Sequence, residues 1–208
     1  MTTIHSIKET IFHEFGHLLV YIVANKNSET HIGNVKTVQI GLNKNKITPD
    51  INLYYFDPMQ QNLHIFNNSK NINRTIYWVI LQFSGCLFES IYDDIDFNKL
   101  FCSRVECHGK TDFDNIYYFN IKSFFKITDT DIERIKSNYL EILYRHNIFE
   151  KTEKYLEHFL TIHGSNPQLG FDSDDIETLL EEMEQWIISN EFISDFNWLV
   201  DNESKNFL

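Results

Sequence analysis

The chain has 208 residues, of which 42% are apolar, and a formal net charge of −12. A chain of this length and composition can bury a hydrophobic core and is not typical of a disordered protein. Its negative charge argues against nucleic acid as a partner. No apolar run reaches the roughly 20 residues that cross a bilayer, and no signal peptide is visible. Three cysteines are too few for a disulfide scaffold, so we expect a cytoplasmic protein without a membrane anchor.

Hydrophobic periodicity predicts the elements of the first half. Apolar residues at intervals of three and four indicate one amphipathic helix over residues 4–24. Alternation over residues 38–42 is typical of a strand, and residues 51–55 form a plausible partner after a turn at 43–46. A second core helix is marked by Ile76, Ile80, Phe83, Leu87 and Ile91.

The second half is predicted to be helical, with irregular connections. Residues 93–109 have no clear period, and a third helix begins near Thr111. Thr130 and Glu133 have the spacing of a capping box that opens the next helix. A break near Asn147 separates that helix from another. The predicted class is therefore mainly α with a small β element (α+β).

The last part of the chain differs in charge from the rest. After a predicted loop at residues 164–170, residues 172–190 read as an acidic helix, and the final residues are less regular. Residues 172–208 hold 11 acidic residues and one basic residue, whereas residues 1–171 hold 19 and 17. We therefore divide the chain into a domain at 1–171 and an acidic helical appendage at 172–208. The appendage is either a solvated helix face or a docking segment for a basic protein.

One motif on the first predicted helix carries chemistry. His13-Glu14-Phe15-Gly16-His17 is a His-Glu-x-x-His sequence, which places two imidazoles on one helix face, one turn apart. Such a pair suits Zn²⁺, and Glu14 is placed to act as general base on a zinc-bound water in peptide hydrolysis. Gly16 weakens a helix, which favours close backbone packing at that position.

A catalytic zinc also needs a third protein ligand. Residue chemistry alone leaves several carboxylates and one imidazole open for this role. The candidates are Glu89, Asp93, Asp94, His108, Asp112 and Asp114.

Four further segments extend the pattern in order along the chain. Residues 11–20 resemble the HEAGHALV helix of the FtsH-type zinc peptidases, and residues 35–40 fall where that family has a strand. Residues 84–90 (Ser-Gly-Cys-Leu-Phe-Glu-Ser) resemble its GGRAAEE helix, and residues 108–116 resemble its GASNDIERAT segment. Residues 129–156 follow the pattern of its late helices. The resemblance covers roughly residues 4–180.

The resemblance implies a helical zincin-like peptidase domain of the FtsH type. Carried over residue by residue, the zinc ligands are His13, His17 and Asp112. Glu14 becomes the base, and Glu89 becomes a partner that orients a ligand or an alternative ligand. Asp114 is the alternative to Asp112, which is preferred because Asp112-Phe113-x-x-Ile116 keeps more of the family's pattern.

The substrate and its partners follow less directly. Val38, Gln39 and Ile40 are candidate substrate-binding residues, as an edge strand that pairs with an extended peptide or as a strand that only supports the hairpin. His13 lies so near the start of the sequence that we expect no ATPase module before it. We therefore expect short peptides or unfolded polypeptides as substrates, unless a separate ATPase supplies them.

Two departures keep other functions open. Phe15 and Leu18 replace small residues of the family pattern, which narrows the cleft or repacks the helix. The main alternative to a zinc metallopeptidase is therefore a catalytically inactive binding or adaptor module, and a purely structural metal site is another. Cys102, Cys107 and His108 could be read as a second metal site, but their spacing fits no common zinc pattern.

Overall fold

The structure is a computed structural model that describes residues 4–27, 29–43, 46–55, 69–117, 126–163, 168–171 and 173–207. The helices are α1 (Ile4–Asn25), α2 (Ser69–Tyr92), α3 (Phe97–Leu100), α4 (Lys110–Tyr117), α6 (Asp129–Arg145), α7 (Ile148–His163), α8 (Ser173–Ile187) and α9 (Asn190–Ser204), followed by a 3-10 turn (Lys205–Phe207). The strands are β1 (Gly33–Asn43), β2 (Lys46–Tyr55) and β3 (Gln168–Phe171). The predicted class, mainly helical with a small β element, is confirmed. No helix in the described ranges combines the length and apolar character needed to cross a membrane.

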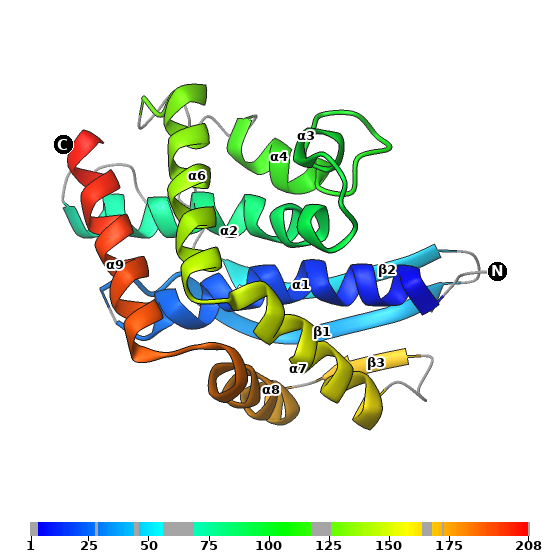
Figure 1. Cartoon of the computed structure of the whole chain (residues 1–208). Helices are drawn as coiled ribbons and strands as arrows, with labels where there is room; N and C mark the ends of the chain where they lie inside the picture. The colour runs from blue at the N-terminus through cyan, green and yellow to red at the C-terminus, as the bar shows by residue number, and fades with distance from the viewer. Residues whose placement is uncertain are drawn as a thin grey trace.

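Helices α1 and α2 lie side by side through the middle of the molecule (Figure 1). Ile76, Ile80, Phe83 and Leu87 of α2 share one core with the apolar residues of α1 from Ile11 on, as the periodicity predicts, whereas Ile91 is 36% exposed. The two backbones approach closely at Gly16, where a Cβ would lie 2.7 Å from the Ser84 carbonyl oxygen. Ser84 Oγ also donates a hydrogen bond to the Gly16 carbonyl oxygen at 2.9 Å. This contact confirms the expected close packing at Gly16 and fixes the motif helix against α2.

Strand β1 is the central strand of a three-stranded antiparallel sheet. It pairs with β2 on one side and with β3 on the other, in the order β2-β1-β3. The expected hairpin is therefore confirmed, although part of its turn lies outside the described residues. Val38, Gln39 and Ile40 pair with β2 and with β3 at the same time. Since both edges of β1 are occupied there, the prediction that these residues form an edge strand for substrate is wrong.

The N-terminus of α6 is capped two residues earlier than the sequence pattern predicts. Thr128 Oγ1 accepts a hydrogen bond from the Asp131 backbone N at 3.1 Å. The Asp131 carboxylate accepts one from the Thr128 backbone N at 2.8 Å. The capping box is thus Thr128 with Asp131 rather than Thr130 with Glu133. The apolar residues predicted for this helix are all buried: Ile132, Ile135, Tyr139, Ile142 and Leu143.

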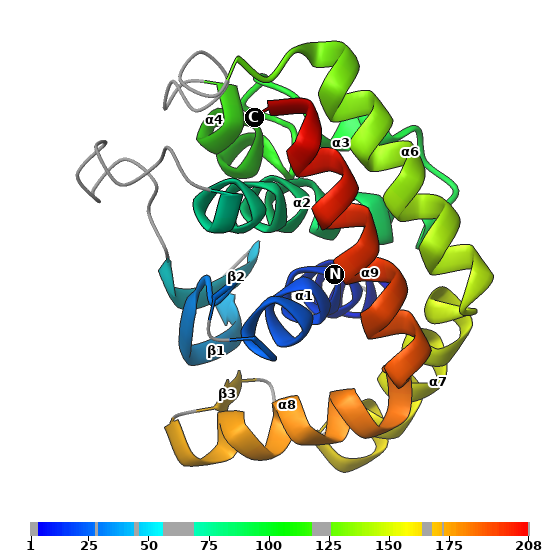
Figure 2. The same cartoon turned by 90° about the vertical axis from the view of Figure 1, so that its left-hand side faces the viewer.

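The acidic C-terminal segment packs into the same core as the residues before it. The predicted loop at 164–170 ends in β3, and the final residues form α9 instead of being irregular. Figure 2 shows β3 and α8 on the side of β1 away from β2, and α9 running past α2. The two helices bury eight apolar side chains: Ile176, Leu179, Met183, Ile187, Phe192, Phe196, Leu199 and Val200. The predicted boundary at residue 171 therefore marks a change in charge along the sequence and does not coincide with a break in the hydrophobic core. The division into two domains stays a prediction.

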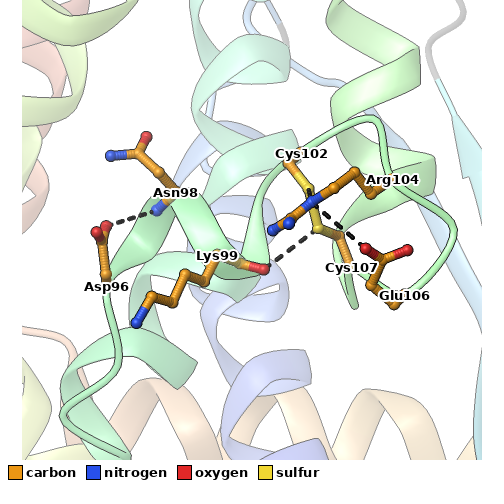
Figure 3. Close-up of a disulfide and its surroundings, with 7 residues drawn as sticks. All are labelled: Asp96, Asn98, Lys99, Cys102, Arg104, Glu106 and Cys107. Atoms are coloured by element: carbon orange, nitrogen blue, oxygen red, sulfur yellow. Dashed lines mark hydrogen bonds and ion pairs between the residues drawn. A yellow bond between two sulfur atoms is a disulfide. The ribbon is translucent and has the colours of Figure 1, made fainter.

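A disulfide joins Cys102 to Cys107 in the connection between α3 and α4 (Figure 3). Their Cα atoms are 5.9 Å apart. The count of three cysteines pointed away from disulfides, and the structure corrects that expectation for this pair. Because each sulfur is bonded to the other, the two cysteines do not form the second metal site considered above. Cys86, on α2, is a buried free thiol.

Candidate metal centre

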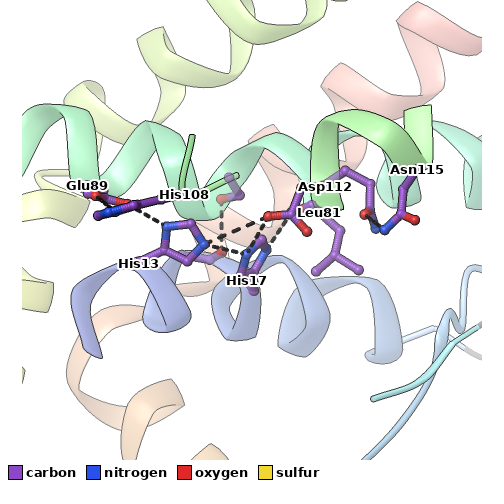
Figure 4. A network of polar contacts seen from close by, with 10 residues as sticks. His13, His17, Leu81, Glu89, His108, Asp112 and Asn115 are labelled. Carbon is purple, nitrogen blue, oxygen red and sulfur yellow. Dashed lines mark hydrogen bonds and ion pairs between the residues drawn. The ribbon is translucent and has the colours of Figure 1, made fainter. Parts of the chain in front are cut away.

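Two imidazoles on successive turns of α1 form the centre of the site. His13 and His17 are both buried, and their rings face α2 (Figure 4). His13 Nδ1 lies 2.9 Å from a carboxylate oxygen of Glu89, and His17 Nδ1 lies 2.7 Å from the Leu81 carbonyl oxygen. Carboxylate and carbonyl oxygens only accept hydrogen bonds, so each Nδ1 carries the proton and donates it. Each Nε2 is therefore left with its lone pair.

The two Nε2 atoms face each other and the carboxylate of Asp112. They lie 3.1 Å apart, and Asp112 Oδ2 is 3.9 Å from His13 Nε2 and 3.6 Å from His17 Nε2. With both protons on Nδ1, no hydrogen bond joins the two rings. A point equidistant from the three atoms lies about 2.1 Å from each, which is the distance that Zn²⁺ keeps from nitrogen and oxygen ligands. This buried group could hold a metal ion.

Asp112 reaches the group from the first turn of α4, which packs on α2. Burial raises the pKa of its carboxyl, and the neighbouring His17 and His13 partly offset that rise. Asp114, the sequence alternative, pairs instead with Lys110 on its own helix. The structure thus brings Asp112 to the two imidazoles, and Asp114 is not part of the group.

Glu89 orients His13 from the side of the ring opposite Nε2. Glu89 is buried, and its carboxylate accepts hydrogen bonds on both oxygens, from His13 Nδ1 and from His108 Nδ1 at 2.5 Å. Burial raises the pKa of this carboxyl, but the hydrogen bonds from His108 and His13 outweigh burial and lower the pKa to about 2. Glu89 is therefore an ionised hydrogen-bond partner of His13, a candidate metal ligand.

Glu14 follows His13 directly on α1 and interacts electrostatically with His17 and Asp112. Its side chain is buried, and no hydrogen bond or ion pair joins it to another described residue. Burial raises its pKa to about 7, with further contributions from the negative charges of Asp112 and Glu89, while His17 acts in the opposite direction. A carboxyl with a pKa near neutrality can both accept and release a proton, as a general base and acid must.

Gly85 is a site residue that the sequence analysis did not single out. A Cβ at this position would lie 2.3 Å from His17 Nε2 and 2.5 Å from His13 Nε2. Only glycine has no Cβ, so only glycine leaves the space in front of the two Nε2 lone pairs free. The signal in the sequence was its place four residues before Glu89 on the second core helix.

The bulky motif residue Phe15 points away from the metal group. Its ring packs against Tyr155 and Phe159 of α7, with ring centroids 5.3 Å and 5.5 Å apart. Leu18 is likewise buried in the core. Both departures from the family pattern therefore repack the helix and do not fill the space between the imidazoles.

Comparisons of the chain with protein-family models, with curated proteins and with solved structures return no match.

Proposed function

We propose that this chain is a zinc-dependent metallopeptidase of the FtsH type. The observation that carries the proposal is the convergence of two Nδ1-protonated imidazoles and the Asp112 carboxylate on one buried point, next to Glu14. The arrangement agrees with the ligands and the base that the resemblance implies. It also gives a physical reason for each of the four residues, independent of that resemblance.

Zinc is the metal that the donor set favours. Two imidazole nitrogens and one carboxylate oxygen are typical of Zn²⁺, and three protein ligands are typical of catalytic rather than structural zinc sites. Structural sites are closed by four protein ligands, most of them cysteines. In the described part of the chain, the one free thiol is Cys86, and it is not part of the metal group.

The roles of the residues follow from their contacts. When bound, Zn²⁺ polarises a carbonyl and lowers the pKa of water in its coordination sphere. Glu14 would accept the proton of the attacking water and pass it to the leaving amine. Glu89 and the Leu81 carbonyl keep the His13 and His17 rings in the tautomer that turns Nε2 toward the metal.

The proposed substrates are short or unfolded polypeptides, as the resemblance implies. The test is cleavage of an unfolded protein by the zinc-loaded chain, with and without a chelator, alongside Glu14→Gln. We expect chelator-sensitive cleavage that Glu14→Gln abolishes while its zinc content stays at one per chain. Glu150→Gln, on the exposed face of α7, is the matched control and should retain full activity.

Two outcomes would contradict the proposal. Stoichiometric zinc without any cleavage of unfolded polypeptides would indicate a binding or adaptor module that retains the fold. Equal cleavage by the wild type and by Glu14→Gln would remove Glu14 from the mechanism.

A further inference from the structure

The segment between α3 and α4 connects the metal centre to a disulfide. His108 follows Cys107 directly in the sequence, and its Nδ1 lies 2.5 Å from Glu89 Oε1. The other oxygen of Glu89 accepts the proton of His13 Nδ1. A chain of contacts therefore runs from the disulfide through His108 and Glu89 to a candidate metal ligand (Figures 3 and 4).

His108 has few other constraints of its own. Its side chain is 65% exposed, whereas that of Glu89 is 4% exposed. The backbone after His108 is fixed, because Gly109 donates a hydrogen bond to the Leu100 carbonyl oxygen at 3.0 Å and lies directly on Cys86. The backbone before it is fixed by Cys107, which is bonded to Cys102 and has its Sγ 3.2 Å from the Lys99 carbonyl oxygen.

The residues enclosed by the disulfide contribute little further restraint. Residues 103–106 are all exposed, and Val105 is 87% exposed. Arg104 and Glu106 form an exposed ion pair, which contributes at most about 1 kcal/mol. Without the covalent bond, the backbone before His108 would be held less firmly, by two local hydrogen bonds: from Cys107 N to the Arg104 carbonyl oxygen and from Lys110 N to the Cys107 carbonyl oxygen.

We propose that His108 is a positioning residue for the metal centre, and that the Cys102–Cys107 disulfide holds it in place, so that metal affinity depends on the oxidation state of this pair. Loss of the His108 contact frees one oxygen of Glu89, which can then rotate away from His13. Partners that orient a ligand in this way commonly change metal affinity by about 10- to 100-fold when they are removed. The inference rests on the proposed metal centre and not on its catalytic role.

The switch needs a dithiol as reductant. Two electrons and two protons pass from the dithiol to the disulfide, which gives two cysteine thiols, while the dithiol is oxidised to its own disulfide. Cys102 is the more exposed member of the pair, and Arg104 Nε lies 3.3 Å from its sulfur. A nearby guanidinium stabilises a thiolate, which favours opening of the bond.

The test measures zinc affinity by competition with a chromophoric chelator. Cys102→Ser/Cys107→Ser removes the bond without creating thiols that could bind zinc themselves. We expect His108→Ala to weaken zinc binding about tenfold, and the double serine variant to weaken it by about three- to tenfold. His108→Gln keeps a donor for Glu89 and should recover most of the loss.

The combination of variants is the sharpest arm of the experiment. If both changes act through the same contact, adding His108→Ala to the double serine variant should cause little further loss. Ser103→Ala, inside the disulfide loop, and His146→Ala, which removes a distant histidine–aspartate contact, are the controls and should leave the affinity unchanged. Thermal unfolding of the metal-free proteins reports whether each variant is folded.

Each outcome bears on the inference. Zinc affinity within twofold of wild type in folded His108→Ala, or losses that multiply when the variants are combined, would overturn it while leaving the metal centre in place. A wild-type chain that binds no zinc would overturn both this inference and the proposed function. Zinc binding that responds as predicted, in a chain that cleaves no polypeptide, would contradict only the proposed function.

Discussion

Gly85 lies so close to His17 that a single added carbon would enter the metal centre. The Cβ of an alanine at position 85 would lie 2.3 Å from His17 Nε2, well inside van der Waals contact. We therefore expect Gly85→Ala to displace the ligand atoms and weaken zinc binding by at least about 100-fold, the upper end of the range for changes around a ligand.

Gly16→Ala is the matched control for this prediction, because it also adds a carbon to the interface of α1 and α2. Its Cβ would meet the Ser84 carbonyl oxygen and the Phe88 ring instead of the imidazoles. We expect it to lower the stability of the fold, while any zinc that the folded fraction binds should be held with near wild-type affinity. Zinc binding by Gly85→Ala equal to that of wild type would contradict the geometry of the site.

Zinc is expected to stabilise the folded chain. The metal-free site brings two imidazole lone pairs and a carboxylate together, and a bound cation removes that repulsion. At zinc concentrations of about 100 times the dissociation constant, mass action adds about 2.7 kcal/mol to the free energy of unfolding. For a chain of this size, that corresponds to a rise in Tm of roughly 5–10 °C.

The measurement is a thermal melt of the chelated and zinc-loaded protein. His17→Ala should lose the shift, whereas His146→Ala, which lies outside the metal group, should keep it. A zinc-induced shift that persists in His17→Ala would place the ion elsewhere.

Removal of residues 172–208 is expected to unfold the domain. The deleted helices supply eight buried apolar side chains to the common core. Each such loss costs about 2–5 kcal/mol, so the sum exceeds the roughly 5–15 kcal/mol that stabilises a typical domain. Circular dichroism and urea unfolding of residues 1–171 should show no cooperative transition, and a native-like transition would restore the view of this segment as a separate appendage.

The capping box of α6 predicts a pH-dependent contribution to stability. Burial raises the pKa of Asp131, but hydrogen bonds from Thr128 and the ion pair with Arg134 outweigh it, so the pKa lies below its ordinary value of 3.8. Because the pKa is lower in the folded state, the ionised carboxylate stabilises the fold at pH values above the pKa of the unfolded chain. This stabilisation is lost as the pH falls through the pKa of the folded state. Asp131→Asn should therefore cost about 1 kcal/mol at pH 7.

Urea unfolding at a series of pH values checks this prediction. The difference between wild type and Asp131→Asn should narrow below pH 3.8 and vanish at more acidic values. Glu133→Gln, which removes the acid of the other register, is the control and should have no effect on capping. Equal pH profiles for wild type and Asp131→Asn would contradict the assigned cap.

Local pattern was sufficient to predict the parts of the site that lie on one helix. The spacing of His13 and His17 and the apolar period of α1 together define a buried pair of imidazoles on one face. The identification of Asp112 needed information beyond local pattern, because six candidate ligands follow the motif. The resemblance selected the candidate that the structure brings to the imidazoles.

What the sequence missed depends on contacts between distant segments. The central place of β1 depends on β3, a strand about 130 residues later that has only four residues, too few for a strand pattern to be recognised. Thr128 and Thr130 are each followed three residues later by an acid, so the pattern fits two registers and only the fold selects one. The pairing of Cys102 with Cys107 is local, over five residues, but a chain with three cysteines gave no reason to expect it.

The central claim, that His13, His17 and Asp112 share one zinc ion, is tested most directly by zinc K-edge X-ray absorption of the fully loaded chain. We predict one zinc per chain, with ligands that are all nitrogen or oxygen at about 2.0–2.2 Å, two of them showing the scattering of imidazole rings. Sulfur in the coordination sphere, a single imidazole, or less than a tenth of a zinc per chain after loading would contradict the account.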